Sequence, residues 1–289
     1  VMALFSGGTL VICDDDVSRD PLLLTEFMRS EGITVATLPP VLLMELSPHP
    51  GVLRTVISAG EECPLEVVKQ WTPSPDRAFF NAYGPTEATV CATMGKLSCE
   101  TETVNIGKPL HNVKIMILDK YLQPVLPGAV GEICIAGPSL AREYINQPVL
   151  TGDVFIFHPV TKERIYRTGD LGSWTDEGSL LFHGRKDRQI KLYGYRIEPG
   201  EIESVLNTVD GVADSTVVYV DDDYPRLVAF VKGSASCIDM GMIVKEIARV
   251  VPSYMIPSTI IEVDRWPLTR TGKKDIAQLV RRAGERRDT

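Results

Sequence analysis

The chain has 289 residues, of which 44% are hydrophobic and 24% are charged, and its formal net charge at pH 7 is −8. This length predicts about two domains, and the acidic balance argues against a broad nucleic-acid-binding surface. No apolar run approaches the roughly 18 residues that a membrane-spanning helix needs. We therefore expect a soluble, cytoplasmic protein with neither nucleic acid nor membrane as a partner.

The cysteines and histidines show no spacing typical of a metal site. The six cysteines form no C-x-x-C pair, and the four histidines form no H-x-H or H-x-x-x-H pair. We expect reduced thiols and no structural zinc. The cysteines are Cys13, Cys63, Cys91, Cys99, Cys134 and Cys237.

The start of the chain is expected to lie inside a longer protein. Residues 1–12 are apolar, but they begin with Val1 and lack the basic residues that open a secretion signal. Gly7 and Gly8 are typical of a helix C-terminus, and residues 9–13 are predicted to form the next strand.

Up to about residue 95 the sequence alternates between predicted strands and helices. This order predicts an α/β fold, with a mostly parallel sheet covered by helices over residues 1–100. In such sheets ligands bind beyond the carboxyl ends of strands, where the loops 58–61 and 81–87 lie. The strands are expected at 9–13, 34–38, 55–59 and 78–82, and the helices at 22–31, after Pro40 and from Pro64.

The rest of the chain shows two further patterns. Short alternating runs over 105–186 predict a small distorted β-barrel that completes a first domain of residues 1–186. Residues 187–289 predict a compact α+β domain, and the rise in polarity over residues 184–187 indicates a domain boundary at which a hinge would make it mobile. The strands of the barrel are expected at 113–118, 131–136 and 179–182. Those of the last domain are expected at 189–193, 196–198, 216–220, 227–231 and 259–263, with helices at 199–207 and 240–251.

Residues 81–87, Asn-Ala-Tyr-Gly-Pro-Thr-Glu, combine the side chains that a nucleotide site uses. Tyr83 offers a ring for stacking, and Gly84 permits close backbone approach. Thr86 can bond a phosphate oxygen, and Glu87 can hold the Mg²⁺ that accompanies ATP. Taken alone, the segment is equally typical of a strand end followed by a turn.

Three further segments carry charged residues on Gly-containing loops. Asp170 follows a Gly turn in residues 166–171 and suits a ribose diol, or it merely caps the turn. Arg185 and Lys191, in residues 184–203, are cations suited to a polyanion, or they belong to a solvated face. Lys273 lies on loop 268–275, where it could stabilise a developing negative charge or be an ordinary surface residue.

Loop 268–275 is not a phosphate-binding P-loop. That motif requires Gly five residues before Gly272 and Ser or Thr after the lysine. Pro267 and Lys274 occupy those two positions.

The order and spacing of these segments resemble the adenylation domain of nonribosomal peptide synthetases, within the superfamily of acyl-CoA synthetases and firefly luciferase. The resemblance covers essentially the whole chain. It is carried by NAYGPTE (81–87), GEICIAGPSLAREYIN (131–146), YRTGDL (166–171), GRKDRQIKLYGYRIEPGEIE (184–203), VPSYMIP (251–257) and LTRTGKKD (268–275).

The resemblance implies that an amino-acid carboxylate is joined to AMP from ATP and Mg²⁺, and that the acyl group then passes to the phosphopantetheine thiol of a peptidyl carrier domain. The carboxylate attack needs alignment and charge neutralisation more than a base. Neighbouring synthetase domains are implied as further partners. The ATP and AMP residues implied are Gly60, Asn81, Ala82, Tyr83, Thr86, Asp170, Phe182, Arg185 and Lys273.

The resemblance also implies a role for each residue. Phe182 faces the adenine opposite residues 81–83; Asp170 matches the ribose carboxylate, and Arg185 its basic neighbour. Thr86, Glu87 and Lys273 match catalytic residues: Thr86 the phosphate contact, Glu87 the Mg²⁺ ligand and Lys273 the lysine of the adenylation step. Asp187 matches the hinge and Lys191 the thioester-forming face.

The side-chain pocket implied by the resemblance is roomy and uncharged, and it looks like that of phenylalanine-activating domains. Sheet-end core residues would give the same composition. The lining positions are Thr37, Ile57, Ala59, Ala82, Val90 and Cys91.

Two departures from the family pattern matter. The N-terminal adenylation portion is missing, including a phosphate loop and the Asp that pairs with the substrate amino group. We expect little activity without that portion. Tyr193 stands where relatives carry Arg, and Lys274 and Ile276 depart from the usual ending. An acyl- or aryl-CoA ligase of the same superfamily, or a non-catalytic docking remnant, remain the alternatives.

Overall fold

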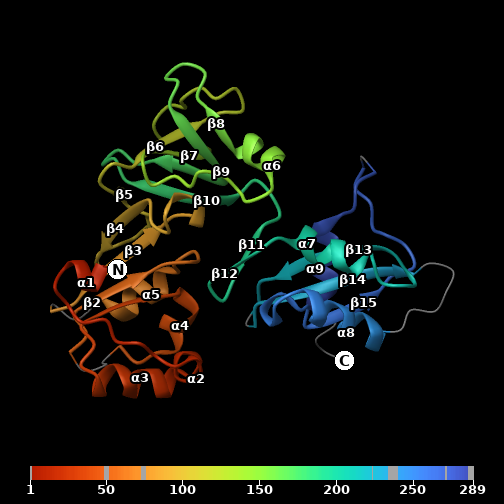
Figure 1. The fold of residues 1–289 in the computed structure, drawn as a ribbon, viewed down its shortest axis with the longest axis horizontal. Coiled ribbons are helices and arrows are strands. Elements are labelled where there is room, and N and C mark those ends of the chain that lie inside the picture. Colours follow the sequence, from red (N-terminus) through yellow and green to blue (C-terminus); the bar gives the residue numbers. More distant parts are fainter. Residues whose placement is uncertain are drawn as a thin grey trace. The chain divides into compact units, whose positions relative to one another are not determined.

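The computed structural model describes residues 2–48, 52–72, 76–222, 224–233, 240–270 and 272–285. The chain divides into two compact units, Val1–Asp187 and Arg188–Thr289. Figure 1 shows the elements of both units.

The first unit begins with a five-stranded sheet of order β1-β2-β3-β4-β5. The first three strands run parallel, as the sequence predicts, whereas β4 and β5 are antiparallel to their neighbours. The register places Leu38, Ser58 and Asn81 side by side at the carboxyl end of the parallel strands. The bounds are β1 Val35–Leu38, β2 Thr55–Ser58, β3 Ala78–Tyr83, β4 Thr93–Leu97 and β5 Lys108–Pro109.

Three helices, drawn in red and orange in Figure 1 with the sheet, share one hydrophobic core with it. Trp71 is fully buried there and donates its indole N–H to the carbonyl of Leu43 at 2.9 Å. Asp20 caps the first of the three helices by accepting from the backbone N–H of Leu22 and Leu23. The helices of this region are α1 Met2–Phe5, α2 Asp15–Arg19, α3 Pro21–Ser30, α4 Pro40–Glu45 and α5 Leu65–Trp71.

The strand predicted at residues 9–13 is wrong. The helix before it ends as expected, with Gly7 at φ 74° and the N–H of Gly8 bonded to the carbonyl of Ala3. Residues 8–14 then form neither strand nor helix, and Ile12 is 84% exposed. An apolar run becomes a strand only when a neighbouring strand takes its hydrogen bonds, and β1 pairs with β2 instead.

The predicted small barrel is a curled half-barrel sheet of order β10-β9-β7-β6, with β8 also paired to β9. Every residue of β7 is buried, including Glu132. The bounds are β6 Lys114–Leu118, β7 Gly131–Ala136, α6 Pro148–Val154, β8 Phe155–Phe157, β9 Arg164–Trp174 and β10 Leu180–Arg185.

A close backbone crossing joins the two sheets of the first unit. The N–H of Ile106 donates to the carbonyl of Leu180 at 2.8 Å, and the N–H of Leu180 donates to the carbonyl of Gly107 at 2.8 Å. Gly107 has φ 76°, and a Cβ there would lie 1.9 Å from the carbonyl carbon of Met94. Only glycine fits this position, and the crossing brings the end of β3 next to β9 and β10.

The second unit has its own hydrophobic core around a three-stranded sheet of order β13-β14-β15. Its elements follow the predicted α+β pattern, although β13 starts at Val212, four residues earlier than expected. The strands are β11 Ile190–Leu192, β12 Tyr195–Ile197, β13 Val212–Val220, β14 Arg226–Gly233 and β15 Thr259–Glu262. The helices are α7 Pro199–Leu206, α8 Met240–Val250 and α9 Ile276–Glu285, with a 3-10 turn at Ser253–Met255. The hinge at Asp187 and the mobility stay predictions.

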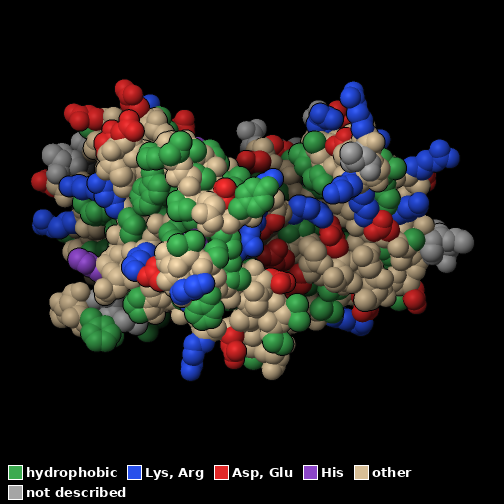
Figure 2. Space-filling model, turned by 90° about the horizontal axis from the view of Figure 1, so that it is seen from above, with side chains coloured by type: hydrophobic (Ala, Val, Ile, Leu, Met, Phe, Trp, Pro, Cys, Tyr) green, Lys and Arg blue, Asp and Glu red, His purple; other side chains and the backbone are tan. Residues whose placement is uncertain are grey.

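Lys and Arg side chains are interspersed with Asp and Glu over the face seen in Figure 2, with hydrophobic side chains exposed among them. Within the described ranges, no helix has the length and apolarity needed to cross a membrane. The five cysteines described are free thiols, and Cys237 lies outside the described residues.

Candidate functional site

Asp170 lies at the centre of a buried polar cluster where the two sheets of the first unit meet. Its carboxylate accepts from the Tyr83 hydroxyl at 2.6 Å and from Arg185 Nη1 at 2.5 Å. Asp170 is 2% exposed and Tyr83 is 6% exposed. The end of β3 and a cross-strand pair of β9 and β10 thus place three predicted site residues in direct contact.

The environment of Tyr83 keeps its hydroxyl protonated. Burial raises the pKa of Tyr83 well above its ordinary value, and the neighbouring Asp170 carboxylate raises it further. Tyr83 is therefore a hydrogen-bond donor rather than a base.

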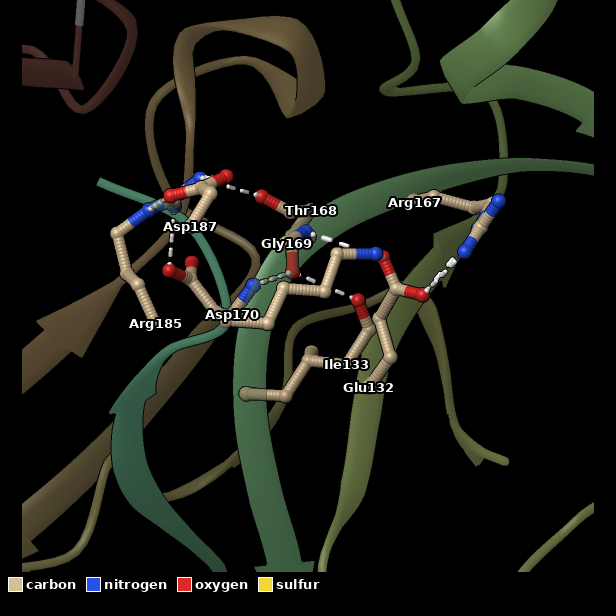
Figure 3. Close-up of polar contacts among 9 residues, drawn as sticks. Glu132, Ile133, Arg167, Thr168, Gly169, Asp170, Arg185 and Asp187 are labelled. Carbon is tan, nitrogen blue, oxygen red and sulfur yellow. Dashed lines mark hydrogen bonds and ion pairs between the residues drawn. The ribbon is translucent and has the colours of Figure 1, made fainter. Parts of the chain in front are cut away.

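Arg185 uses its planar guanidinium to bridge two carboxylates. Besides Asp170, it donates through Nε and Nη2 to the two oxygens of Asp187, both at 2.7 Å, and from Nη2 to the carbonyl of Thr168 at 3.1 Å. This forked geometry is one that lysine cannot reproduce. The predicted hinge residue Asp187 is thereby tied to the Asp170 cluster, as Figure 3 shows.

The turn predicted before Asp170 is instead an irregular stretch inside β9, where the pairing with β7 shifts register, and a glycine shapes its backbone. Gly169 has φ 77°, and a Cβ on it would lie 2.7 Å from Arg185 Nη2 and 2.8 Å from Asp187 Oδ2. The Thr168 hydroxyl donates to the carbonyl of Ile133 at 2.7 Å and accepts from the backbone N–H of Asp170 at 2.9 Å. The sequence Thr-Gly-Asp thus fixes where the Asp170 carboxylate points.

Glu132 is a site residue that the sequence analysis missed. Its buried carboxylate accepts from Arg167 Nη2 at 2.8 Å, from Lys186 Nζ at 2.6 Å and from the backbone N–H of Gly169 at 3.2 Å (Figure 3). Burial opposes ionisation, but the hydrogen bonds from Lys186 and Arg167 outweigh it and lower the pKa of Glu132. A charged residue inside the apolar strand GEICIA was the available signal.

Burial also affects the thiol nearest to this cluster. Burial and the nearby Glu132 carboxylate raise the pKa of Cys134 to about 12. Cys134 is therefore an inert core residue, as expected for a cysteine in this strand.

An aromatic pair lies next to Asp170. The rings of Tyr83 and Phe182 have centroids 6.2 Å apart and are tilted by 41°. Asn81 is 3% exposed and donates its side-chain amide to the carbonyl of Asn105 at 2.9 Å, so its orientation is fixed. Ala82, between Asn81 and Tyr83 in the sequence of β3, is also buried. Gly60 is exposed, with φ 98°, in the loop after β2.

The loop after β3 has an unusual backbone. Thr89 and Val90 both have left-handed conformations, with φ 59° and 68°, which cost energy in residues with branched side chains. A Cβ on Gly84 would lie 2.6 Å from the backbone nitrogen of Ala92. The loop therefore folds back tightly on the strand end.

Thr86 and Glu87 occupy a short 3-10 turn, Thr86–Ala88, within that loop. Thr86 is exposed, whereas Glu87 is 5% exposed and its carboxylate accepts a hydrogen bond from the Tyr144 hydroxyl. Burial, then the bond to Glu87, raise the pKa of Tyr144 above its ordinary range. Tyr144 therefore acts as a donor that orients the Glu87 carboxylate.

Among the described residues, Glu87 is the predicted metal ligand, and no complete set of protein ligands surrounds it. In the part of the chain that the structure describes, no three His, Cys, Asp or Glu side chains are grouped to hold a metal ion. Mg²⁺ in nucleotide sites is usually held by one or two carboxylates together with phosphates and water. A single buried, oriented carboxylate at Glu87 fits that mode of binding.

The predicted side-chain pocket residues come from three neighbouring strands and the loop after them. Thr37 and Ile57 are paired across β1 and β2, with Ala59 just beyond the end of β2. Val90 and Cys91 lie on the left-handed loop, and Val90 is 73% exposed. The six positions thus gather at the carboxyl end of the sheet, with Thr37 and Val90 exposed.

The remaining predicted residues lie in the second unit. Lys191 is the central residue of β11, paired with Arg196 of β12. Lys273 is exposed on the loop before α9. The structure therefore groups Asp170, Tyr83, Phe182, Arg185 and Asp187 in one cluster and places the two lysines on separate elements of the second unit.

Comparison with known proteins identifies the family. Residues 1–145 match the model for AMP-binding enzymes, and residues 201–273 match the model for the AMP-binding enzyme C-terminal domain. Together with the fold, these matches define the class as adenylate-forming ligases. The chain belongs to the AMP-binding enzyme family.

Similar proteins include peptide synthetases. The chain is 42% identical to bacitracin synthase 3 of Bacillus licheniformis over 94% of its own length and 4% of that protein. It is 40% identical to novobiocin biosynthesis protein H of Streptomyces niveus over 96% of its length and 47% of that protein.

Solved structures of the family have the same fold. IdnL1 superposes with a TM-score of 0.79 at 29% identity, covering 92% of this chain and 58% of IdnL1. Holo-PA1221, an NRPS protein containing adenylation and PCP domains, superposes with a TM-score of 0.79 at 28% identity. The match covers 91% of this chain and 47% of the PA1221 chain. The chain thus spans about half the length of these two structures and of novobiocin biosynthesis protein H.

Proposed function

We propose that the chain forms the nucleotide- and acid-binding part of an amino-acid adenylation domain. In this reaction an amino-acid carboxylate attacks the α-phosphorus of ATP, aminoacyl-AMP forms and pyrophosphate leaves. The acyl group then passes to the phosphopantetheine thiol of a carrier domain, with loss of AMP. The peptide-synthetase relatives and the matches to both parts of the AMP-binding family support this assignment.

The buried Asp170 cluster is the observation that carries the proposal. A carboxylate fixed by Tyr83 and Arg185 presents acceptors suited to a ribose diol. Phe182, whose ring lies 6.2 Å from that of Tyr83, provides the second aromatic surface for an adenine. Gly60, Asn81 and Ala82 are proposed to complete the adenine edge.

Thr86 and Glu87 are proposed to act on the phosphate side. The exposed Thr86 hydroxyl bonds a phosphate oxygen, and Glu87, oriented by Tyr144, supplies the protein ligand to Mg²⁺. When bound, Mg²⁺ neutralises phosphate charge. Because adenylation depends on alignment and charge neutralisation, the orientation of Glu87 by Tyr144 lowers the reorganisation that the reaction needs.

Residues of the second unit are proposed to serve the two half-reactions. Lys273 stabilises negative charge during adenylation. Asp187, held by Arg185 in this structure, is the proposed hinge about which the second unit turns, and Lys191 belongs to the face used in thioester formation.

The acid is proposed to be phenylalanine or a similar large apolar amino acid. The six pocket positions, Thr37 to Cys91, carry no charged side chain, so a polar substrate would leave its polar groups unpaired.

Activity is proposed to require a complementing N-terminal portion. Apolar side chains along the first 35 residues are exposed, among them Phe5 at 90%, Ile12 at 84%, Leu22 at 81% and Val35 at 56%. Val35 opens β1, which pairs with no strand but β2 among the described residues. Exposed apolar side chains and a strand edge that no second strand covers fit a further polypeptide segment as partner.

Amino-acid-dependent exchange of pyrophosphate into ATP tests this function. The chain joined to its complementing portion should catalyse exchange with phenylalanine and related amino acids, and the isolated chain should show little or none. Strong exchange by the isolated chain would refute the requirement for a partner. Activation of aryl or fatty acids instead of amino acids would favour an acyl-CoA ligase, and carrier binding without exchange would favour a docking remnant.

A further inference from the structure

Lys274, the residue after Lys273, makes more contacts than a surface lysine. Its ammonium group donates to Asp214 Oδ1 at 2.8 Å, to the carbonyl of Ser215 at 2.9 Å and to Thr216 Oγ1 at 2.8 Å. It also lies 4.1 Å from the centroid of the Trp266 ring. Three hydrogen bonds use all three N–H groups of an ammonium, so this side chain is held in one place.

The acceptors of Lys274 are three consecutive residues on β13 of the second unit. This strand pairs with β14 along one edge. Lys274 bonds the other edge through the carbonyl of Ser215, where a further strand would otherwise donate. The loop before α9 is thereby attached to the central sheet of its own unit.

The backbone on both sides of Lys273 is held as well. The N–H of Lys273 donates to Thr269 Oγ1 at 3.2 Å, and its carbonyl accepts from the N–H of Thr269 at 2.7 Å. Asp275 donates its N–H to the carbonyl of Pro267 at 2.8 Å and accepts from the N–H of Gln278 at the start of α9. Lys273 itself is exposed. Its Cα position is therefore set by neighbours, and Lys274 is the residue that joins them to β13.

We propose that Lys274 is a positioning residue for Lys273: it clamps residues 272–275 to β13, so that Lys273 is presented from a fixed backbone position during adenylate formation. This inference rests on the proposed function for the role of Lys273. The clamp itself rests only on the contacts of Lys274.

The chemistry of the clamp predicts which half-reaction depends on it. Adenylate formation needs the Lys273 ammonium near developing negative charge, and a misplacement of about 1 Å can cost about a hundredfold in rate. Thioester formation from a finished adenylate does not involve Lys273 in the proposed scheme. Loss of Lys274 should therefore slow the first half-reaction selectively.

The test compares Lys274→Met with Lys274→Arg in the full protein. Methionine keeps the apolar stem and removes the charge, whereas arginine can still bond Asp214 and the Ser215 carbonyl. Lys232→Met is the matched control because Lys232 lies opposite Asp214 on β14 and is not part of the loop. Three measurements are made: pyrophosphate exchange, thioester transfer from preformed aminoacyl-AMP, and amide hydrogen exchange of Thr269, Gly272 and Asp275.

Lys274→Met should reduce pyrophosphate exchange by about tenfold to a hundredfold. It should leave thioester transfer within about twofold and speed amide exchange at the three loop positions. Lys274→Arg should show smaller changes than Lys274→Met in both pyrophosphate exchange and amide exchange. Lys232→Met should resemble the wild type in all three measurements.

If amide exchange at the three loop positions is the same in Lys274→Met as in wild type, the clamp is refuted, whatever the rates of the two half-reactions. Faster amide exchange with normal pyrophosphate exchange, or an equal loss in both half-reactions, would overturn the positioning role. A wild-type protein without any adenylation would instead refute the proposed function, and amide exchange would still decide on the clamp.

Discussion

The Tyr83 hydroxyl donates to the carboxylate of Asp170 at 2.6 Å, although the two residues are 87 positions apart in the chain. One residue ends a strand of the first sheet and the other lies in the middle of β9. The bond therefore joins the two sheets of the first unit at the proposed nucleotide site. If the site binds a nucleotide as proposed, stability and nucleotide binding depend on the same atoms.

Tyr83→Phe should destabilise the first unit while keeping an aromatic surface. The variant leaves the buried Asp170 carboxylate without one donor, and a hydrogen bond to a charged group contributes about 1.5 to 3 kcal/mol. Urea unfolding followed by fluorescence would measure the change. Tyr121→Phe, at a residue that is 69% exposed, should change the unfolding free energy by less than about 0.5 kcal/mol and is the control.

Asp170→Asn should weaken ATP binding. The amide offers one acceptor where the carboxylate offers two, and it removes the charge that pairs with Arg185 at 2.5 Å. We expect the KM for ATP to rise about tenfold or more, with a smaller effect on the KM for the amino acid. Initial-rate kinetics in the complemented protein would show this. Equal KM values for ATP in Asp170→Asn and wild type would contradict the ribose assignment.

Glu132→Gln should remove part of the acid sensitivity of the protein. A carboxyl whose pKa is lowered by folding stabilises the folded state above its unfolded-state pKa, which is near 4.5 for Glu132. That contribution is lost as the pH falls through the lower, folded-state pKa. Unfolding free energies measured from neutral pH downward should therefore fall less steeply in Glu132→Gln than in wild type below about pH 4.5.

At neutral pH, Glu132→Gln should be less stable than wild type by about 1.5 to 3 kcal/mol, because Arg167 and Lys186 lose a charged acceptor. Glu163→Gln is the control, since Glu163 forms a more exposed ion pair with Lys114. Parallel pH profiles for Glu132→Gln and wild type would show that Glu132 does not titrate as inferred.

Lys273→Ala should slow adenylation strongly and spare the second half-reaction. Removing a group that stabilises developing charge costs about 10² to 10³ in rate. Pyrophosphate exchange should fall accordingly, while thioester transfer from preformed aminoacyl-AMP continues. Arg270→Ala, at an exposed cation on the same loop, should change neither rate substantially. A comparable loss of both half-reactions in Lys273→Ala would argue against a role specific to adenylation.

Local patterns in the sequence were sufficient for most of the fold. The alternation of apolar strands with Pro-initiated helices predicted the parallel core around Val56 and Phe79, and strand 131–136 has the bounds expected. The run at residues 9–13 failed because strand formation depends on a partner strand, which a local pattern does not contain.

The parts of the site that could not be predicted are contacts between residues far apart in the sequence. Single motifs indicated Tyr83, Asp170 and Arg185 as candidate site residues. The order of the motifs along the chain, through the family resemblance, indicated that the three belong to one nucleotide site. Nothing local showed that Glu132 would bind Arg167 and Lys186, which follow it by 35 and 54 positions. The Tyr144 hydroxyl bond to Glu87 spans 57 positions and was missed for the same reason.

Direct detection of aminoacyl-AMP tests the central claim most sharply. The chain, joined to its complementing N-terminal portion, is incubated with ATP, Mg²⁺ and a mixture of amino acids, and bound products are identified by mass spectrometry. We expect an amino-acid adenylate, phenylalanyl-AMP foremost, which the Lys273→Ala protein forms at least about a hundredfold more slowly. A folded, ATP-binding wild-type protein that yields no aminoacyl-AMP from any amino acid would contradict it.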